Sequence, residues 1–550
     1  MTPMADVTTP AHVQNRPTPR TWAVVLAACV GQFLVVLDVS VVNVALPSMR
    51  SDLGLSAAQL QWVLNAYAIA FAGFMLLGGR AADLYGRKRM FLVGLGLFTA
   101  ASLAGGFAQE GWQLLAARAA QGLGAAVLSP ATLTILTAAV PEGHARTRAI
   151  GTWMAVGAGG GAAGGMVGGV LTDVLNWRWV LLINVPFGVL VLIGGAAWLA
   201  ESRARERHRI DLLGAVLVTA GLAAVAYGIV QTEQEGWAAA ATLVPLLGGL
   251  ALLALFVLVE ARTAAPLMPL RVLGTREVAA ANVAMIVMGS ATFSMWYFMT
   301  VYAQSVLGYT PMQAGFALLP TSLAVVLGST FAPRMMARVG AKNLVLIGLA
   351  VTAAGFGWQS TMGADGSYVT SICGPGILMM AGAGFASTPL ASLATSGAAP
   401  GDAGLVSGLV NTSRTMGGAL GLAVLSTVAA ARTGGGTGAE DLTAGFALAF
   451  RTAGSVLLGG LLLMTLWLPR HRSPRSGTPS PSGTSSPSRT SSPSRTSSPS
   501  RTSSPSGTSS PSGTSSPSGT SSPSGTSSPS GTSSPSGTSS ASGMSRSSGE

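Results

Sequence analysis

Charged residues are scarce in this chain: Asp, Glu, Lys and Arg together make up 9% of its 550 residues, whereas hydrophobic residues make up 49%. A soluble chain carries roughly a quarter charged residues. The scarcity of charge therefore excludes an ordinary soluble protein of several domains. The mean hydropathy of +0.52 is the value expected of a chain that lies largely in a membrane.

Cysteine and histidine are also scarce. The two cysteines, Cys29 and Cys373, lie within apolar stretches and offer neither a disulfide framework nor metal-ligand spacing. The four histidines all lie outside those stretches, at His12, His144, His208 and His471. This placement argues against a zinc site or a histidine proton relay inside a membrane, so we expect no metal and no cofactor.

The apolar residues occur in blocks that match the roughly 20 residues with which a helix crosses a bilayer. Helices are predicted because backbone groups in lipid must be satisfied within the segment, and no alternating pattern of a barrel strand is present. We predict fourteen spans, near residues 22–46, 60–79, 90–108, 112–138, 148–171, 179–200, 211–231, 239–260, 278–305, 312–332, 343–360, 368–396, 403–431 and 444–468.

The basic residues predict the orientation of these spans. Arg87, Lys88 and Arg89 lie between spans 2 and 3, and four arginines lie between spans 6 and 7, on the same side of the membrane as both ends of the chain. By the positive-inside rule, both termini are cytoplasmic. The net charge of +12 is spread over these short loops instead of one face, so we expect no nucleic-acid partner.

The end of the chain changes to a six-residue repeat, "SGTSSP" or "SRTSSP", which has almost no apolar side chains and is predicted to be disordered. An expendable extension and a phosphorylated or partner-binding tail both remain open. We predict five parts: a cytoplasmic segment 1–20, a six-helix bundle 21–205, two inserted helices 206–265, a second six-helix bundle 266–470 and the repeat tail 471–550.

Two of the charged residues inside the predicted spans lie at similar depths in the membrane. Asp38 interrupts "QFLVVLDVSVVNVALP" in span 1, and Arg118 interrupts "LLAARAAQGLGAA" in span 4, three residues before Gln121. A helix rise of about 1.5 Å per residue places Asp38 and Arg118 roughly 13 and 9 Å below the same surface. An unpaired acid costs about 2.5–3.5 kcal/mol at the centre of a spanning helix. We therefore hypothesise that Asp38 is a proton site held ionised by Arg118; a static structural pair is the alternative.

Glycine marks two further segments. The loop "GGRAADLYGRKRM" after span 2 suits a tight turn with facing charges, and the residues that form it include Gly79, Asp83, Gly86, Arg87 and Lys88. In span 5, "GGAAGGMVGG" repeats glycine every four residues, which lets another helix approach closely. The predicted glycine face consists of Gly160, Gly164, Gly168 and Gly169.

Other classes of membrane protein find little support. The spans show no clustered carboxylates or activated nucleophile of a membrane enzyme, and no recurrent polar residues of a channel filter. Span 9 contains Met295, Trp296, Tyr297 and Phe298, whose large side chains suit an adaptable cavity for hydrophobic compounds. Packing and lipid contact are the alternative roles for these four residues.

Together these stretches resemble the signature motifs of the major facilitator superfamily, in particular its fourteen-helix drug:proton antiporters. The loop after span 2, the span 4 stretch, "NWRWVLLINVPFG" before span 6 and "GLVNTSRTMGGALG" in span 13 occur in the family's order. The chain departs from the family at Gly165, where proline is usual, and at Leu84, where arginine is frequent. The missing proline implies a less kinked span 5.

The resemblance implies an all-α polytopic membrane protein with two six-helix bundles, spans 1–6 and 9–14, and two helices inserted between them. The bundles would rock about a midplane cavity, these residues of the loop after span 2 would be the gating residues of a latch, and span 5 would be the hinge or sliding helix. Gln121, Asn411 and Arg414 join the span 9 residues as candidates for lining that cavity.

The predicted function is a proton-coupled exporter of hydrophobic or amphipathic drugs, and not an enzyme. We expect a monomer in the plasma membrane whose partners are a small hydrophobic substrate, protons and the bilayer, with the proton gradient as its energy source. The alternatives are an exporter of one endogenous metabolite or lipid, and a membrane receptor or scaffold that does not transport.

Overall fold

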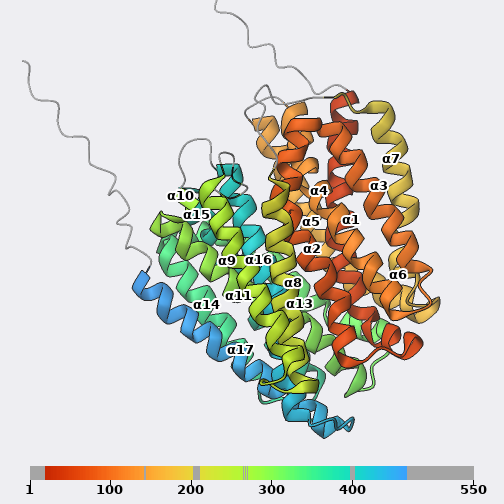
Figure 1. The fold of residues 1–550 in the computed structure, drawn as a ribbon, viewed down its shortest axis with the longest axis vertical. Coiled ribbons are helices and arrows are strands. Elements are labelled where there is room, and N and C mark those ends of the chain that lie inside the picture. The colour runs from red at the N-terminus through yellow and green to blue at the C-terminus, as the bar shows by residue number, and fades with distance from the viewer. Residues whose placement is uncertain are drawn as a thin grey trace, which may run out of the picture. The chain divides into compact units, whose positions relative to one another are not determined.

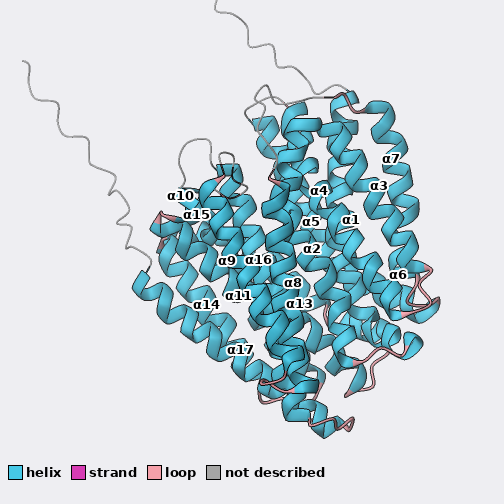
Figure 2. Ribbon diagram, in the orientation of Figure 1, coloured by secondary structure: helices cyan, strands magenta, loops and turns pink. Residues whose placement is uncertain are grey.

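The structure, a computed structural model of the chain, describes residues 19–140, 144–201, 211–263, 266, 268, 270–396 and 403–467. These residues are almost entirely helical, and no β-strand occurs among them (Figure 2). The predictions for residues 1–18 and for the repeat tail lie outside the described residues. In chain order the helices are α1 (Pro19–Leu53), α2 (Ala57–Tyr85), α3 (Arg87–Gly106), α4 (Gly111–Ala139), α5 (His144–Val174), α6 (Trp179–Leu182), α7 (Asn184–Trp198), α8 (Leu212–Glu235), α9 (Ala240–Arg262), α10 (Leu270–Leu273), α11 (Arg276–Ser305), α12 (Pro311–Ala317), α13 (Leu319–Val339), α14 (Ala341–Gln359), the π-helix η1 (Val369–Cys373), α15 (Gly374–Ser396), α16 (Ala403–Thr433) and α17 (Ala439–Trp467).

Fourteen segments in the described part of the chain are long and apolar enough to cross a membrane, which confirms the predicted number. Three of them consist of two helical pieces each: α6 with α7, α12 with α13, and η1 with α15. The sixth span breaks at Ile183, immediately before Asn184. In contrast, α5 runs without interruption past Gly165, as expected where the usual proline is missing.

Local sequence explains where several helices begin and end. Ser56 begins α2 with a capping box, because its hydroxyl accepts from the Gln59 backbone N–H and its own N–H donates to the Gln59 side chain. Gly86, at φ +110°, separates α2 from α3 in a conformation that favours glycine. These ends hold the loop after span 2 to a single residue.

The helices pack mainly within two halves of the chain. Helices α1–α7 contact one another, as do α11–α17, and Figure 1 shows these two sets, red to yellow and green to blue, on opposite sides of the molecule. The halves meet where α2 contacts α16, where α5 contacts α12 and α13, and where α1 contacts α11. The division of the chain into five parts stays a prediction.

The two inserted helices lie at one of the seams between the halves. Helix α8 packs against α9 and also contacts both α2 and α16. Buried residues of these helices form one apolar cluster, which includes Ile69 of α2, Leu222 of α8 and Ala423 of α16. The α8–α9 hairpin is therefore attached to both halves of the molecule.

Candidate functional site

The side chain of Asp38 lies in the middle of α1 and is bound by three donors from other helices. Arg118 Nη1 donates to Asp38 Oδ2 at 2.6 Å, and Gln121 Nε2 donates to Asp38 Oδ1 at the same distance. Asn184 Nδ2 donates to Oδ1 at 3.0 Å. The exposed fractions of Arg118 and Asp38 are 1% and 0%, so the two residues form a fully buried ion pair.

Arg118 is held by more than this carboxylate. Its Nε donates to the carbonyl oxygen of Val63 at 3.1 Å, and Nη1 also donates to Gln121 Oε1 at 2.7 Å. The guanidinium lies 4.5 Å from the centre of the Tyr67 ring, which is a cation–π geometry. These contacts hold the guanidinium in addition to its pairing with Asp38.

Two residues of this network, Ser102 and Asn184, were not predicted from the sequence. The hydroxyl of Ser102 accepts from Gln121 Nε2 and from Asn184 Nδ2, and it donates to the carbonyl oxygen of Leu181. Asn184 lies in the quoted stretch "NWRWVLLINVPFG", and an amide inside an apolar span was the signal that could have identified it. Because Asn184 begins α7 directly after the helix break, its side chain reaches α1 and α3.

The oxygen of this amide, Asn184 Oδ1, is buried and has no hydrogen-bond partner among the described residues. A buried acceptor without a partner is costly. A half-turn of the amide would place this oxygen next to Asp38 Oδ1, where it could accept a hydrogen bond from a protonated carboxyl. The site therefore contains a donor for the ionised form of Asp38 and an acceptor available for the neutral form.

A cavity of about 460 Å³ lies beside this network, between helices of the two halves. Its wall is mostly apolar and includes Val35, Phe71, Met288 and Val325. Six residues of α1 line the cavity, from Gln32 at one end to Asn43 at the other. The four between them are Val35, Val36, Val39 and Ser40. Arg118 contributes to the wall, so the buried ion pair borders the cavity.

Of the residues predicted to line a cavity, the structure brings Trp296, Asn411 and Arg414 to this one. Gln121 is fully buried in the Asp38 network and is not part of the lining. Met295, Tyr297 and Phe298 are also buried, which is a correction of the predicted cavity lining.

The physical reason for this correction is the rotation of α11. Phe298 packs against Phe446 and Phe450 of α17, at ring-centre distances of 5.5 and 6.0 Å. Consecutive residues of a helix point in different directions, so this packing leaves Trp296 alone among the four facing the cavity.

The candidate gating residues lie at the turn between α2 and α3. Arg87 Nη2 lies 3.2 Å from Asp83 Oδ1 in a half-exposed ion pair across Gly86. The Lys88 backbone N–H donates to Glu201, and Lys88 Nζ donates to the carbonyl oxygen of Ala196. Gly79 faces Pro130 of α4. All of these partners belong to the first half of the chain, and these contacts link no gating residue to the second half.

The glycines of α5 contact two different helices. Gly160, Gly164 and Gly168 lie against α1, and a Cβ at Gly168 would lie 2.7 Å from the carbonyl oxygen of Val41. Gly169 instead lies against α12, where a Cβ would be 2.5 Å from the Pro311 carbonyl oxygen. Gly169 is therefore not on the same face as the other three, because it is rotated by about 100° from Gly168.

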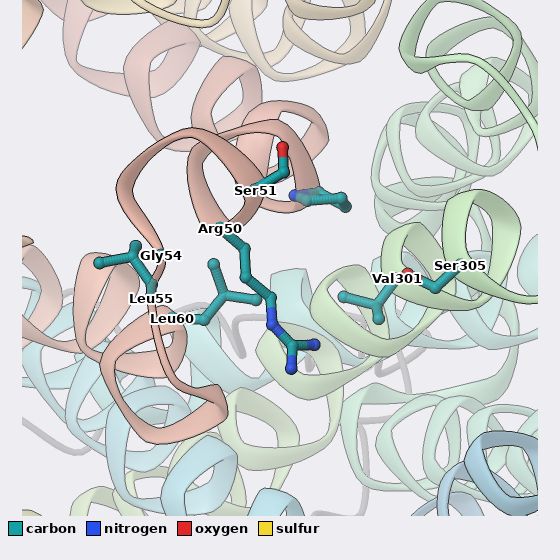
Figure 3. A pocket seen from close by; sticks show the side chains of 8 residues that line it. Arg50, Ser51, Gly54, Leu55, Leu60, Val301 and Ser305 are labelled. Carbon is teal, nitrogen blue, oxygen red and sulfur yellow. The ribbon is translucent and has the colours of Figure 1, made fainter. Parts of the chain in front are cut away.

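A second hollow, of about 410 Å³, lies at the other end of α1. Figure 3 shows the Arg50 side chain extending into it from the last turn of α1, opposite Val301 and Ser305 of α11. Between the two hollows, Gln304 Nε2 of α11 donates to the carbonyl oxygen of Val44 at 2.8 Å. This hydrogen bond joins α11 to α1, and therefore joins the two halves of the molecule, between the two hollows.

The sequence matches the Major Facilitator Superfamily over residues 28–422. It is 48% identical over 425 residues to the cephamycin export protein CmcT of Amycolatopsis lactamdurans, which covers 76% of this chain and 87% of that protein. It is 37% identical over 420 residues to the puromycin resistance protein pur8 of Streptomyces alboniger, covering 76% and 83%. The multidrug resistance protein Stp of Mycobacterium tuberculosis is 34% identical over 410 residues, covering 74% and 75%.

The fold resembles solved transporters at low sequence identity. An auto-inhibited peptide transporter of the POT family superposes with a TM-score of 0.63 at 16% identity, over 84% of this chain and 99% of that one. The nucleoside transporter NupG superposes with a TM-score of 0.59 at 12% identity, over 81% and 100%. The predicted fold class is confirmed, and the chain belongs to the Major Facilitator Superfamily as a multi-pass membrane transporter of small molecules and not an enzyme.

Proposed function

We propose that the chain is a proton-coupled antiporter that exports hydrophobic or amphipathic compounds, antibiotics among them, across the plasma membrane. The observation that carries the proposal is the buried Asp38–Arg118 pair in the wall of an apolar cavity. Intramembrane ionisable residues that pair with each other are typical of proton relays in transporters. The names of the relatives, which refer to export of and resistance to antibiotics, support the substrate class.

In this proposal the proton binds Asp38. In the ionised state the carboxylate accepts from Arg118, Gln121 and Asn184, the arrangement in the structure. A proton on Asp38 removes the attraction to Arg118, which keeps its contacts with Val63 and Tyr67. Because α1, α4 and α7 each contribute a residue, the change in charge alters the packing of three helices beside the cavity.

Alternating access is supported by a difference between the two ends of the cavity. The lining extends along α1 towards Gln32, whereas at the opposite end α1 is tied to α11 through Gln304 and Val44, and Gly169 lies against Pro311. With both termini in the cytoplasm, this arrangement corresponds to the state that faces inward. The bundles 21–205 and 266–470 would rock against each other, α5 would be the sliding helix, and the Asp83–Arg87 turn would latch the cytoplasmic side in the other state.

Orientation is tested by labelling single cysteines in a background in which Cys29 and Cys373 have been replaced. Gln234→Cys lies at the end of α8 on the proposed outer side, and Arg205→Cys lies between spans 6 and 7 at the proposed cytoplasmic side. An impermeant thiol reagent added to intact cells should label only Gln234→Cys. Labelling of Arg205→Cys alone would invert the topology.

Transport is tested in everted membrane vesicles of an efflux-deficient host. Respiration acidifies their lumen, so an antiporter that moves a compound inward releases protons and raises the luminal pH. Puromycin and lincomycin, suggested by the names of the relatives, are the first compounds to add, together with a susceptibility panel in intact cells. A substrate should raise the luminal pH in vesicles that contain the wild-type protein and not in vesicles without it.

The same vesicles distinguish the alternatives. A compound that binds the purified protein but is not moved in vesicles would contradict the proposal and favour a receptor. Accumulation that persists after the proton gradient is collapsed with an uncoupler would contradict proton coupling, while leaving export intact.

A further inference from the structure

Arg414 is a cation of the central cavity that no carboxylate neutralises. It lies in α16, is exposed to the cavity, and forms no ion pair within the described residues. Its one hydrogen bond runs from Nη2 to Asn411 Oδ1 at 3.1 Å. A guanidinium has five N–H donors, so four of them have no partner in the described part of the chain.

The charge of the other arginine in the lining is already compensated. Arg118 is paired with Asp38, and the cavity lining contains no aspartate, glutamate or lysine. The cavity therefore carries one net positive charge, located at Arg414, within an otherwise apolar wall. An ionised side chain within a spanning helix is costly, which marks it as functional unless it is paired.

Asn411 fixes where this cation lies. Its Oδ1 accepts from Arg414, while its Nδ2 lies 3.3 Å from the sulfur of Met75 in α2. The guanidinium is thus held from one side and presents its remaining donors to the cavity. A fork of N–H groups fixed in this way matches the two oxygens of a carboxylate.

The second hollow has the same sign of charge. Arg50 lines it, and its other lining residues include no acid. Asp52, the nearest acid along the chain, is instead paired with Arg178 at 2.7 Å. A compound moving between the two hollows would meet an arginine at each.

We infer that the preferred substrates are amphipathic monoanions, whose carboxylate or similar group binds Arg414 while the apolar part lies against residues such as Met288 and Trp296. This inference rests on the proposed export function and specifies its substrate class. The volume of about 460 Å³ suits a drug-sized molecule and is too small for a phospholipid with two acyl chains.

The test is a binding measurement on the full-length protein in discs of neutral lipid, with no proton gradient. Three probes share one fluorophore: dansylglycine is an anion at neutral pH, dansylglycinamide is neutral and dansylcadaverine is a cation. Trp296 lines the cavity and can transfer excitation energy to the dansyl group. Wild-type protein should bind dansylglycine about ten- to a hundredfold more tightly than dansylglycinamide, as expected for hydrogen bonds to charged groups, and dansylcadaverine most weakly.

The variants isolate the contribution of Arg414. Arg414→Gln should reduce the preference for dansylglycine to within about twofold, and Arg414→Lys should keep part of it because the charge remains. Arg334→Gln removes the same charge from an exposed position outside the cavity, and it should leave the preference unchanged. Retained binding of dansylglycinamide shows that a variant is folded.

Three results would overturn the inference: wild-type protein without a preference for the anion, a preference that persists in Arg414→Gln, or dansylglycine binding that is lost when anionic phosphatidylglycerol replaces the neutral lipid. The last result would assign Arg414 to lipid headgroups. The assay measures binding and does not depend on transport. A protein that binds the anion preferentially but transports no compound in vesicles therefore contradicts only the export proposal. Proton-driven export of cations without any anion preference contradicts only this inference.

Discussion

Replacing Asp38 with asparagine keeps the size of the side chain but removes the negative charge that Arg118 contacts at 2.6 Å. Arg118 then remains charged in a buried site, with Gln121 Oε1, the Val63 carbonyl oxygen and the Tyr67 ring as its remaining contacts. The NH₂ group of the new amide would take the place of one carboxylate oxygen and would face N–H groups that donate to Asp38 in the wild-type protein. Asn184 can relieve this conflict, because its unpartnered Oδ1 can turn to accept.

Removing one partner of a buried ion pair costs about 3–5 kcal/mol of stability. We expect Asp38→Asn near the lower end of this range, because Arg118 keeps three contacts. Arg118→Gln should cost more, because it leaves the fully buried Asp38 carboxylate without its cation. The double variant should be more stable than additivity predicts, by about 0.5–3 kcal/mol.

Reversible unfolding in mixed micelles of mild detergent and dodecyl sulfate measures these differences, and everted vesicles measure transport. Asp52→Asn is the matched control, because Asp52 pairs with Arg178 at 2.7 Å on the surface and the substitution should cost under about 1 kcal/mol. Asp38→Asn should bind substrate but lose proton-driven export. Wild-type export by Asp38→Asn with an unchanged dependence on the proton gradient would refute the proton role, and additive stabilities would refute the buried pair.

Three further predictions concern other parts of the molecule. Gly168→Ala should destabilise the protein by about 1–3 kcal/mol, because the new Cβ would lie 2.7 Å from the Val41 carbonyl oxygen. Gly248→Ala is the control and should be neutral, because no atom lies within 4 Å of its new Cβ, and the same unfolding assay compares the two variants. Truncation after Arg475 should leave insertion and export intact, since the Ser/Pro/Thr repeat lacks apolar side chains to bury, and a truncated protein that inserts but does not transport would reject this. When one monoanion leaves and one proton enters, two positive charges in total move inward. A potassium diffusion potential imposed on proteoliposomes should therefore add about 4.6 kcal/mol per 100 mV to the driving force for export. Export that is insensitive to this potential would exclude the stoichiometry.

The number of spans could be predicted from the sequence because lipid allows few alternatives to an apolar helix of fixed length. Asp38 and Arg118 could be singled out for a related reason, since a charge within an apolar span requires an explanation. The structure brings their side chains together. The role of the pair in proton coupling stays a prediction.

Which other side chains face the cavity or join the Asp38 network could not be predicted, because this depends on how each helix is rotated about its axis. Met295, Trp296, Tyr297 and Phe298 are chemically similar and point around the whole circumference of α11, so only the packing of Phe298 against α17 decides that Trp296 faces the cavity. Asn184 escaped notice because a neutral amide is a weaker sequence signal than a charge. Its importance depends on a helix break that brings it next to α1.

The position of α8 has a consequence for compounds that are dissolved in the lipid itself. This helix lies in the seam between α2 and α16 (Figure 1) and closes it along an apolar cluster. Thr427 of α16 donates to the Ile229 carbonyl oxygen of α8 at 3.3 Å. A molecule approaching sideways from the membrane meets a helical hairpin there. At the opposite seam α5 packs directly against α12 and α13, and no inserted hairpin lies there among the described residues, which makes the two sides of the transporter unequal towards the bilayer.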